Sequence, residues 1–131
     1  MITIVMANNK KLFQLRHESD TWKRHLQFIQ QENNYLKTRL SQVLQQDTDE
    51  DFLERAEFFQ NKFIAEDDTV NMLRQDIHEI DQMLEKDKVE ESSIIKDLQK
   101  KLKKMNKDME IVERQFNKLK TDFNTYLADS L

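Results

Sequence analysis

Glu66 is the residue whose type and position could most directly support chemistry, because it is an acid at an inward position of a heptad repeat. A carboxylate removed from water could ligate a metal ion or act as a general acid. A carboxylate-bridged metal site in a helical bundle needs several inward Glu residues and Glu-x-x-His motifs, and the sequence contains no such motif. We therefore interpret Glu66 as part of a polar core layer with Asn33, which occupies another inward position and would fix helix register.

The three histidines do not form a site in the sequence. His17, His25 and His78 fall at outward heptad positions, and no two of them are four residues apart. The chain has no glycine for a strained nucleophile turn or a phosphate-binding loop, and no cysteine for a thiolate or a zinc site. We expect no catalytic residue, no metal and no cofactor, and therefore a protein that is not an enzyme.

A lysine-rich stretch near residue 100 is the most strongly charged feature. Its outward lysines, a candidate anion-binding face, are Lys96, Lys100, Lys103, Lys104 and Lys107. Such a row could track phosphates, but it holds no arginine and no interleaved aromatic residue, both of which single-strand binders use. We interpret it as a solvated charged face; the alternative is a face for nucleic acid or an anionic membrane surface.

A second set of apolar residues falls outside the inward positions. Its members share heptad position c, on the outer side of each helix: Phe28, Tyr35, Phe58, Met72 and Ile111. One interpretation is a core thicker than a single stripe per helix. The other is an interaction surface for a second copy or a partner protein.

Three heptad tracts must position all of these residues. In each tract apolar residues recur in alternating steps of three and four, which predicts a helix with one buried stripe; we call this row of inward positions the seam. The seam of the second tract is Phe52, Ala56, Phe59, Phe63, Glu66, Val70, Leu73, Ile77, Ile80 and Leu84. The predicted helices cover about 10–46, 50–85 and 88–129. Residues 1–9 would form a flexible tail, with Met1 and Met6 both open as the functional start.

The composition supports a single helical domain, because the 131 residues include no glycine and no proline. Acids at 47–51 favour a helix start there, and Asp87 with Glu90 could cap the third helix. We predict turns near Gln46–Asp49 and Glu85–Lys88. The fold class is all-α, an antiparallel up-down-up three-helix bundle with coiled-coil-like heptad packing. The alternative is an extended coiled-coil dimer in which the second and third helices are continuous.

The seams also predict which residues face one another. Antiparallel pairing of the second and third tracts places Phe59 opposite Phe116 and Glu66 near Met109. Two registers remain for the first and second tracts, and the charges beside the seams do not decide between them. We favour the register with Asn33 opposite Glu66 over that with Asn33 opposite Phe59, because it joins two polar residues in one layer.

Charge and length bound the functional classes. The net charge of −4 weighs against a dedicated nucleic-acid binder, and no stretch is long enough for a signal peptide or a membrane span. We expect a cytoplasmic location by default. The favoured function is a non-enzymatic structural or protein-interaction module that binds a protein partner or forms a homo-oligomer. The alternative is a nucleic-acid or anionic-surface accessory protein.

Overall fold

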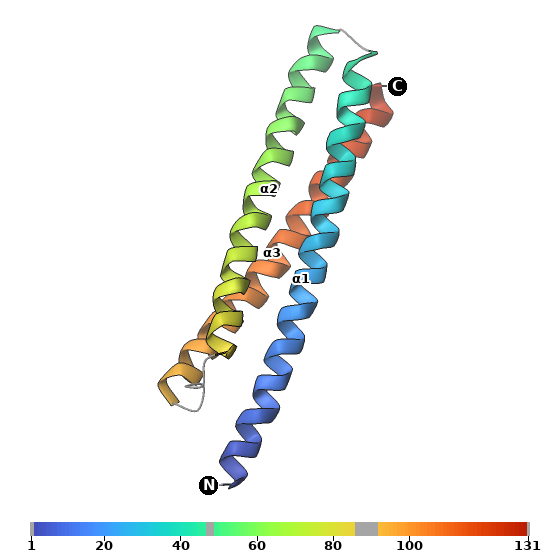
Figure 1. Cartoon of the computed structure of the whole chain (residues 1–131). Coiled ribbons are helices and arrows are strands. Elements are labelled where there is room, and N and C mark those ends of the chain that lie inside the picture. The colour runs from blue at the N-terminus through green and yellow to red at the C-terminus, as the bar shows by residue number, and fades with distance from the viewer. Residues whose placement is uncertain (1, 47–48, 86–91, 131) are drawn as a thin grey trace.

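The protein is an all-α bundle of three helices. The computed structural model describes residues 2–46, 49–85 and 92–130, and describes side chains over 12–46, 49–85 and 95–130. The helices are α1 (Ile2–Leu44), α2 (Glu50–Glu85) and α3 (Ser92–Ser130). They pack side by side, and α2 runs antiparallel to the other two (Figure 1). The alternative with continuous second and third helices is therefore wrong, because the chain reverses direction between Glu85 and Ser92.

α1 is longer than the sequence pattern predicted. It begins at Ile2, whereas we expected a helix start near Lys10 and a tail over 1–9. The N-terminal end of α1 extends beyond the end of α2 and the start of α3 (Figure 1). A helix can continue past its packed region when neither glycine nor proline interrupts it. The heptad pattern therefore locates the packed part of the helix rather than its first residue.

The two connections are close to the predicted turns. α1 ends at Leu44, and the Gln46 amide donates to the Val43 carbonyl oxygen over 3.0 Å. α2 begins at Glu50 with two acids in its first turn, where carboxylates oppose the helix dipole. α3 begins at Ser92 rather than near Lys88. The predicted cap of α3 by Asp87 and Glu90 lies outside the described residues.

The core follows the predicted seams. All of the seam residues predicted for the second tract are buried in α2. At one end of the bundle an aromatic cluster joins α2 to α3. Phe63 meets Phe123 edge to face with ring centroids 5.0 Å apart, and Tyr126 stacks on Phe52 at 5.2 Å. Leu127 is also buried, although it lies beside the predicted seam of α3.

The pairing of α2 with α3 differs from the prediction by one heptad. The ring of Phe59 lies 5.4 Å from that of Phe123 and 5.0 Å from that of Tyr126, whereas we expected it opposite Phe116. A shift of seven residues returns every seam residue to the seam, so the apolar pattern fits both registers. The shifted register brings the largest rings of the two helices together at the end of the bundle, where each aromatic contact adds stability.

The pairing of α1 with α2 is set by hydrogen bonds and ion pairs across their edges. Asn33 and Lys37 both contact Asp67. Two heptads further along, the Ser19 hydroxyl donates to Asp81 over 2.5 Å, and Lys23 pairs with the same carboxylate at 2.5 Å. These contacts give the register in which Asn33 lies level with Glu66.

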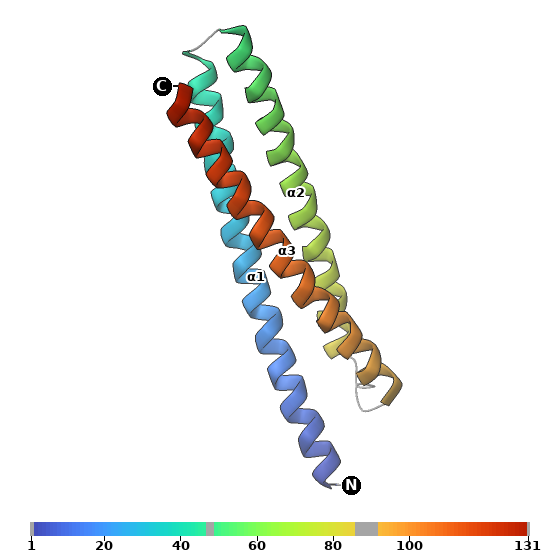
Figure 2. The same ribbon diagram turned by 180° about the vertical axis from the view of Figure 1, so that it is seen from behind.

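α3 crosses the other two helices obliquely. It begins beside the C-terminal end of α2 and ends beside the C-terminal end of α1 (Figure 2). Two polar contacts join α3 to α1: His25 to Glu113 at 2.5 Å and Lys120 to Glu32 at 3.0 Å. α1 therefore meets α2 along the edge that carries Lys23, and meets α3 along the opposite edge.

Candidate functional site

A buried polar layer lies at mid-length between α1 and α2. The Asn33 amide donates both to the Phe63 carbonyl oxygen, over 2.9 Å, and to Asp67, over 2.8 Å. Lys37 forms an ion pair with the second oxygen of the same carboxylate. Asn33 and Glu66 are both buried, with 0% and 7% of their surface exposed. Asp67 of α2 contacts both Asn33 and Lys37 of α1, and so joins the two helices at this layer. The sequence did not single this residue out.

Glu66 is held in an environment that disfavours its charged form. Burial, and to a smaller extent the neighbouring carboxylate of Asp67, raise the pKa of the Glu66 carboxyl to about 7. Its Oε1 atom has no hydrogen-bond partner among the described residues. At neutral pH a substantial fraction of this side chain is therefore protonated and can donate a hydrogen bond as well as accept one.

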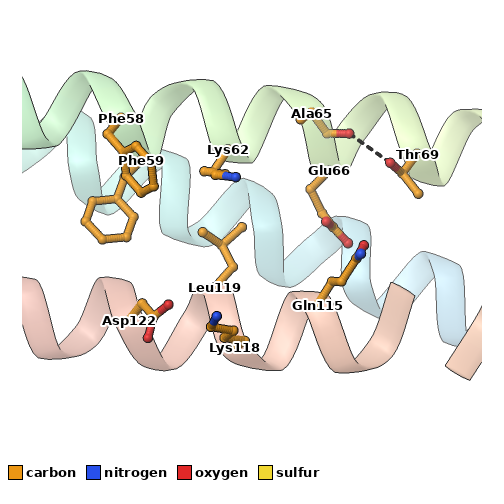
Figure 3. Close-up of a pocket in the computed structure, with 10 residues that line it drawn as sticks. All are labelled: Phe58, Phe59, Lys62, Ala65, Glu66, Thr69, Gln115, Lys118, Leu119 and Asp122. Atoms are coloured by element: carbon orange, nitrogen blue, oxygen red, sulfur yellow. Dashed lines mark hydrogen bonds between the residues drawn. The ribbon is translucent and has the colours of Figure 1, made fainter. Parts of the chain in front are cut away.

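Glu66 also borders a groove between α2 and α3, which we call the α2–α3 groove. The groove has a volume of about 400 Å³ in this region. Its lining residues are Phe58, Phe59, Lys62, Ala65, Glu66, Thr69, Gln115, Lys118, Leu119 and Asp122. In Figure 3 the Glu66 carboxyl extends from α2 toward Gln115 of α3. We expected Met109 at this level, and the one-heptad shift of α3 accounts for the difference.

The apolar residues at position c are exposed and do not belong to a thicker core. Phe28 and Tyr35 are 60% and 62% exposed, Phe58 and Met72 are each 55% exposed, and Ile111 is 39% exposed. Side chains of this size lose favourable free energy when they stay in water, by roughly 1.5–3 kcal/mol each relative to full burial. Their exposure identifies them as the residues that a partner could cover.

These exposed apolar residues lie on two different edges of the bundle. Phe28 and Tyr35 follow His25 and Glu32 by three residues each, so they lie on the edge of α1 that meets α3. Phe58 instead lines the α2–α3 groove, and Met72 lies two heptads after Phe58 on the same row of α2. The structure therefore divides the single surface that the sequence suggested.

The lysines of the candidate anion-binding face are all exposed. Lys104 lies 3.8 Å from Asp108 one turn later, and its neighbour Lys101 lies 3.6 Å from Glu79 of α2. The other members of the face show no ion pair in the described structure: Lys96, Lys100, Lys103 and Lys107. The face is thus a solvated positive strip in the first half of α3, bordered by acids at the α2–α3 groove.

The histidines lie apart from one another on the surface. His25 contacts Glu113, His78 lies 3.2 Å from Gln82, and His17 is exposed. Within the described part of the chain, no group of three or more His, Asp or Glu residues could hold a metal ion. Likewise, none of the described helices is long and apolar enough to span a membrane.

Comparison with known protein families, curated proteins and solved structures gives no match for this chain.

Proposed function

We propose that this chain is a non-enzymatic helical module that binds a protein partner or a second copy of itself through its exposed apolar residues. The observation that supports this function is the exposure of large apolar side chains at outward positions on two edges of the bundle. Phe28, Tyr35, Phe58 and Met72 are each more than half exposed. Apolar residues arranged in rows along helices fit the groove-and-helix contacts by which helical modules bind one another.

The test compares two charge-introducing variants with the wild type. Phe28→Glu with Tyr35→Glu alters the α1 edge, and Phe58→Glu with Met72→Glu alters the α2–α3 groove. Circular dichroism should show that both variants keep their helicity and thermal midpoint, because the replaced side chains are exposed. At least one variant should lose self-association in sedimentation velocity or lose a protein that the immobilised wild type retains. If neither kind of binding depends on these residues, the proposed function is wrong.

A second candidate function uses the lysine-rich face of α3 to bind nucleic acid or an anionic surface. The observation in its favour is the exposure of Lys96, Lys100, Lys103 and Lys107 along one strip. Fluorescence anisotropy with a labelled oligonucleotide, and flotation with phosphatidylserine vesicles, would test it at several salt concentrations. Binding should weaken steeply with salt and be lost in Lys100→Asp with Lys107→Asp. If neither the oligonucleotide nor the vesicles bind at low salt, this function is wrong.

A further inference from the structure

One edge of α3 carries a regular row of charged and apolar residues, which we call the α3 stripe. Its members alternate in steps of four and three: Lys104, Asp108, Ile111, Gln115, Lys118 and Asp122. Residues with this spacing lie on one face of a helix. Gln115, Lys118 and Asp122 line the α2–α3 groove. Lys104 and Asp108 line a second hollow between the same two helices, near Glu79. The stripe therefore runs along the outer side of α3 at the α2–α3 groove.

The opposite wall of the groove, formed by α2, carries exposed apolar side chains among its polar ones. Phe58 and Met72 of α2 are each 55% exposed, and Ile111 of the α3 stripe is 39% exposed. Between the two α2 residues lie Ala65 and Thr69, whose small side chains line the groove beside Gln115. Another helix placed here would cover apolar surface on both walls.

We infer that the α2–α3 groove binds a second copy of this chain, with the two α3 helices antiparallel about a twofold axis. In this arrangement Lys104 of each copy faces Asp122 of the other, and Asp108 faces Lys118. This inference rests on the proposed function and names its partner. The charge order of the α3 stripe is what selects a second copy, because the stripe is complementary to itself when reversed.

Ile111 then lies near the twofold axis, opposite Gln115 of the other copy. Because Gln115 lines the groove beside Ala65 and Thr69, the incoming isoleucine reaches the part of the wall with the smallest side chains. The interface has an apolar centre flanked by ion pairs, as protein interfaces commonly do.

Other arrangements of the two stripes are less favourable. In a parallel pair about a twofold axis, each charged residue would lie beside the same residue of the other copy. Like charges would then face one another and repel. A slip of one heptad in one direction would place Lys101 opposite Lys118 and Asp97 opposite Asp122. A slip in the other direction leaves Asp108 and Lys118 without opposite charges. In the favoured register Asp97 faces Asp129 at the ends of the contact, where both are exposed and salt screens their repulsion.

Charge reversal tests the inference with the full chain. Wild type should dimerise in sedimentation velocity as its concentration rises. Lys104→Asp with Lys118→Asp replaces every attractive pair by a repulsive one and should weaken dimerisation by at least about tenfold. Adding Asp108→Lys and Asp122→Lys recreates the pairs with opposite signs and should restore the wild-type affinity to within about threefold. Lys100→Asp with Lys107→Asp makes the same change in net charge outside the stripe and should leave dimerisation unchanged.

Cross-linking tests the register independently, because the natural chain has no cysteine. An equal mixture of Ile111→Cys and Gln115→Cys proteins should oxidise to a disulfide-linked dimer faster than a mixture of Ile111→Cys and Lys100→Cys proteins. Equal rates would overturn the register. If the variant with all four substitutions in the α3 stripe does not restore dimerisation, the charge pairing is wrong.

A wild type that is monomeric at every concentration would overturn the whole inference. The proposed function would still stand if the immobilised chain retained another protein in a manner sensitive to Phe28→Glu with Tyr35→Glu. The two failures are therefore distinguishable in the same set of proteins.

Discussion

The hydroxyl of Tyr126 donates a hydrogen bond to the backbone carbonyl oxygen of Phe52, over 2.8 Å, at the buried end of the bundle. The rings of the same two residues stack on each other. The end of α3 is thereby joined to the first turn of α2 both by a polar contact and by ring packing. This pair, together with the contact of Phe59 with Phe123, holds the register that differs by one heptad from the prediction.

Tyr126→Phe removes the hydrogen bond and keeps the stacked ring. We expect the free energy of unfolding to fall by about 1 kcal/mol, because the buried carbonyl oxygen of Phe52 loses one hydrogen-bond donor while the helix that contains it is unchanged. Urea denaturation followed by circular dichroism measures this change. Tyr35→Phe is the matched control, since Tyr35 is 62% exposed, and it should leave stability unchanged. Equal effects of the two variants would contradict the role of the hydrogen bond.

Glu66 should give the stability of the bundle a characteristic pH dependence. The carboxyl keeps its proton up to about pH 7 in the folded state and loses it near pH 4.5 in the unfolded state. Between these values the folded state binds more protons, so the free energy of unfolding falls as pH rises from about 4.5 to 7. The loss is on the order of 3 kcal/mol at most.

Glu66→Gln removes this contribution because the amide does not titrate. The variant and the wild type should be similarly stable near pH 4.5, and the variant should be more stable above pH 7. Denaturation curves at a series of pH values give the difference directly. Glu57→Gln, at an exposed position of the same helix, is the control and should run parallel to the wild type. A constant difference between Glu66→Gln and wild type across the range would refute the raised pKa.

Asn33→Leu tests whether the polar layer lowers the stability of the bundle while it fixes a single register of α1 on α2. The amide's Oδ1 atom is buried with no partner among the described residues, so an apolar replacement removes a desolvated polar atom. The replacement also removes the two hydrogen bonds that the amide donates, but Asp67 keeps its ion pair with Lys37 and no buried charge is left unpaired. We expect stability to rise by about 1 kcal/mol and the number of amide resonances in an NMR spectrum to increase, as alternative registers become populated. Asn34→Leu is exposed and should do neither. A less stable variant with a single set of resonances would contradict this role.

Two phenylalanines should respond to truncation in opposite ways. Phe63 is fully buried and contacts Phe123, so Phe63→Ala should cost about 3–5 kcal/mol of unfolding free energy. Phe28 is 60% exposed, so Phe28→Ala should change stability by no more than about 0.5 kcal/mol. Thermal unfolding of both variants measures the contrast. Similar losses for the two would mean that Phe28 belongs to the core.

The number of helices, their packed faces and their buried residues could be predicted from the sequence. Alternating steps of three and four fix which side of a helix is apolar, and the buried residues of α2 are the predicted ones. The same regularity hides the register, because a pattern that repeats every seven residues is unchanged by a shift of seven. Phe59 could therefore be placed on the seam but not matched with Phe123.

The charges beside the seams were more informative than we expected. Lys23 pairs with Asp81 and Lys37 contacts Asp67, and both pairs occur in the same register of α1 on α2. Comparing the two registers by these pairs would have selected the observed one from the sequence. The pKa of Glu66 could not be predicted in this way, since it depends on how completely the neighbouring side chains exclude water.

An odd number of antiparallel helices has a mechanical consequence. Because the bundle has three helices, Ile2 and Ser130 lie near opposite ends of this elongated bundle, which we call the rod (Figure 1). A pulling force applied between these two points acts along the helix axes, so that neighbouring helices must slide past one another. Sliding breaks the interlocked side chains of a whole seam together, whereas pulling from one end would peel them apart in succession. The rod should therefore resist tension along its length and yield more easily to a force that separates α3 sideways from α2.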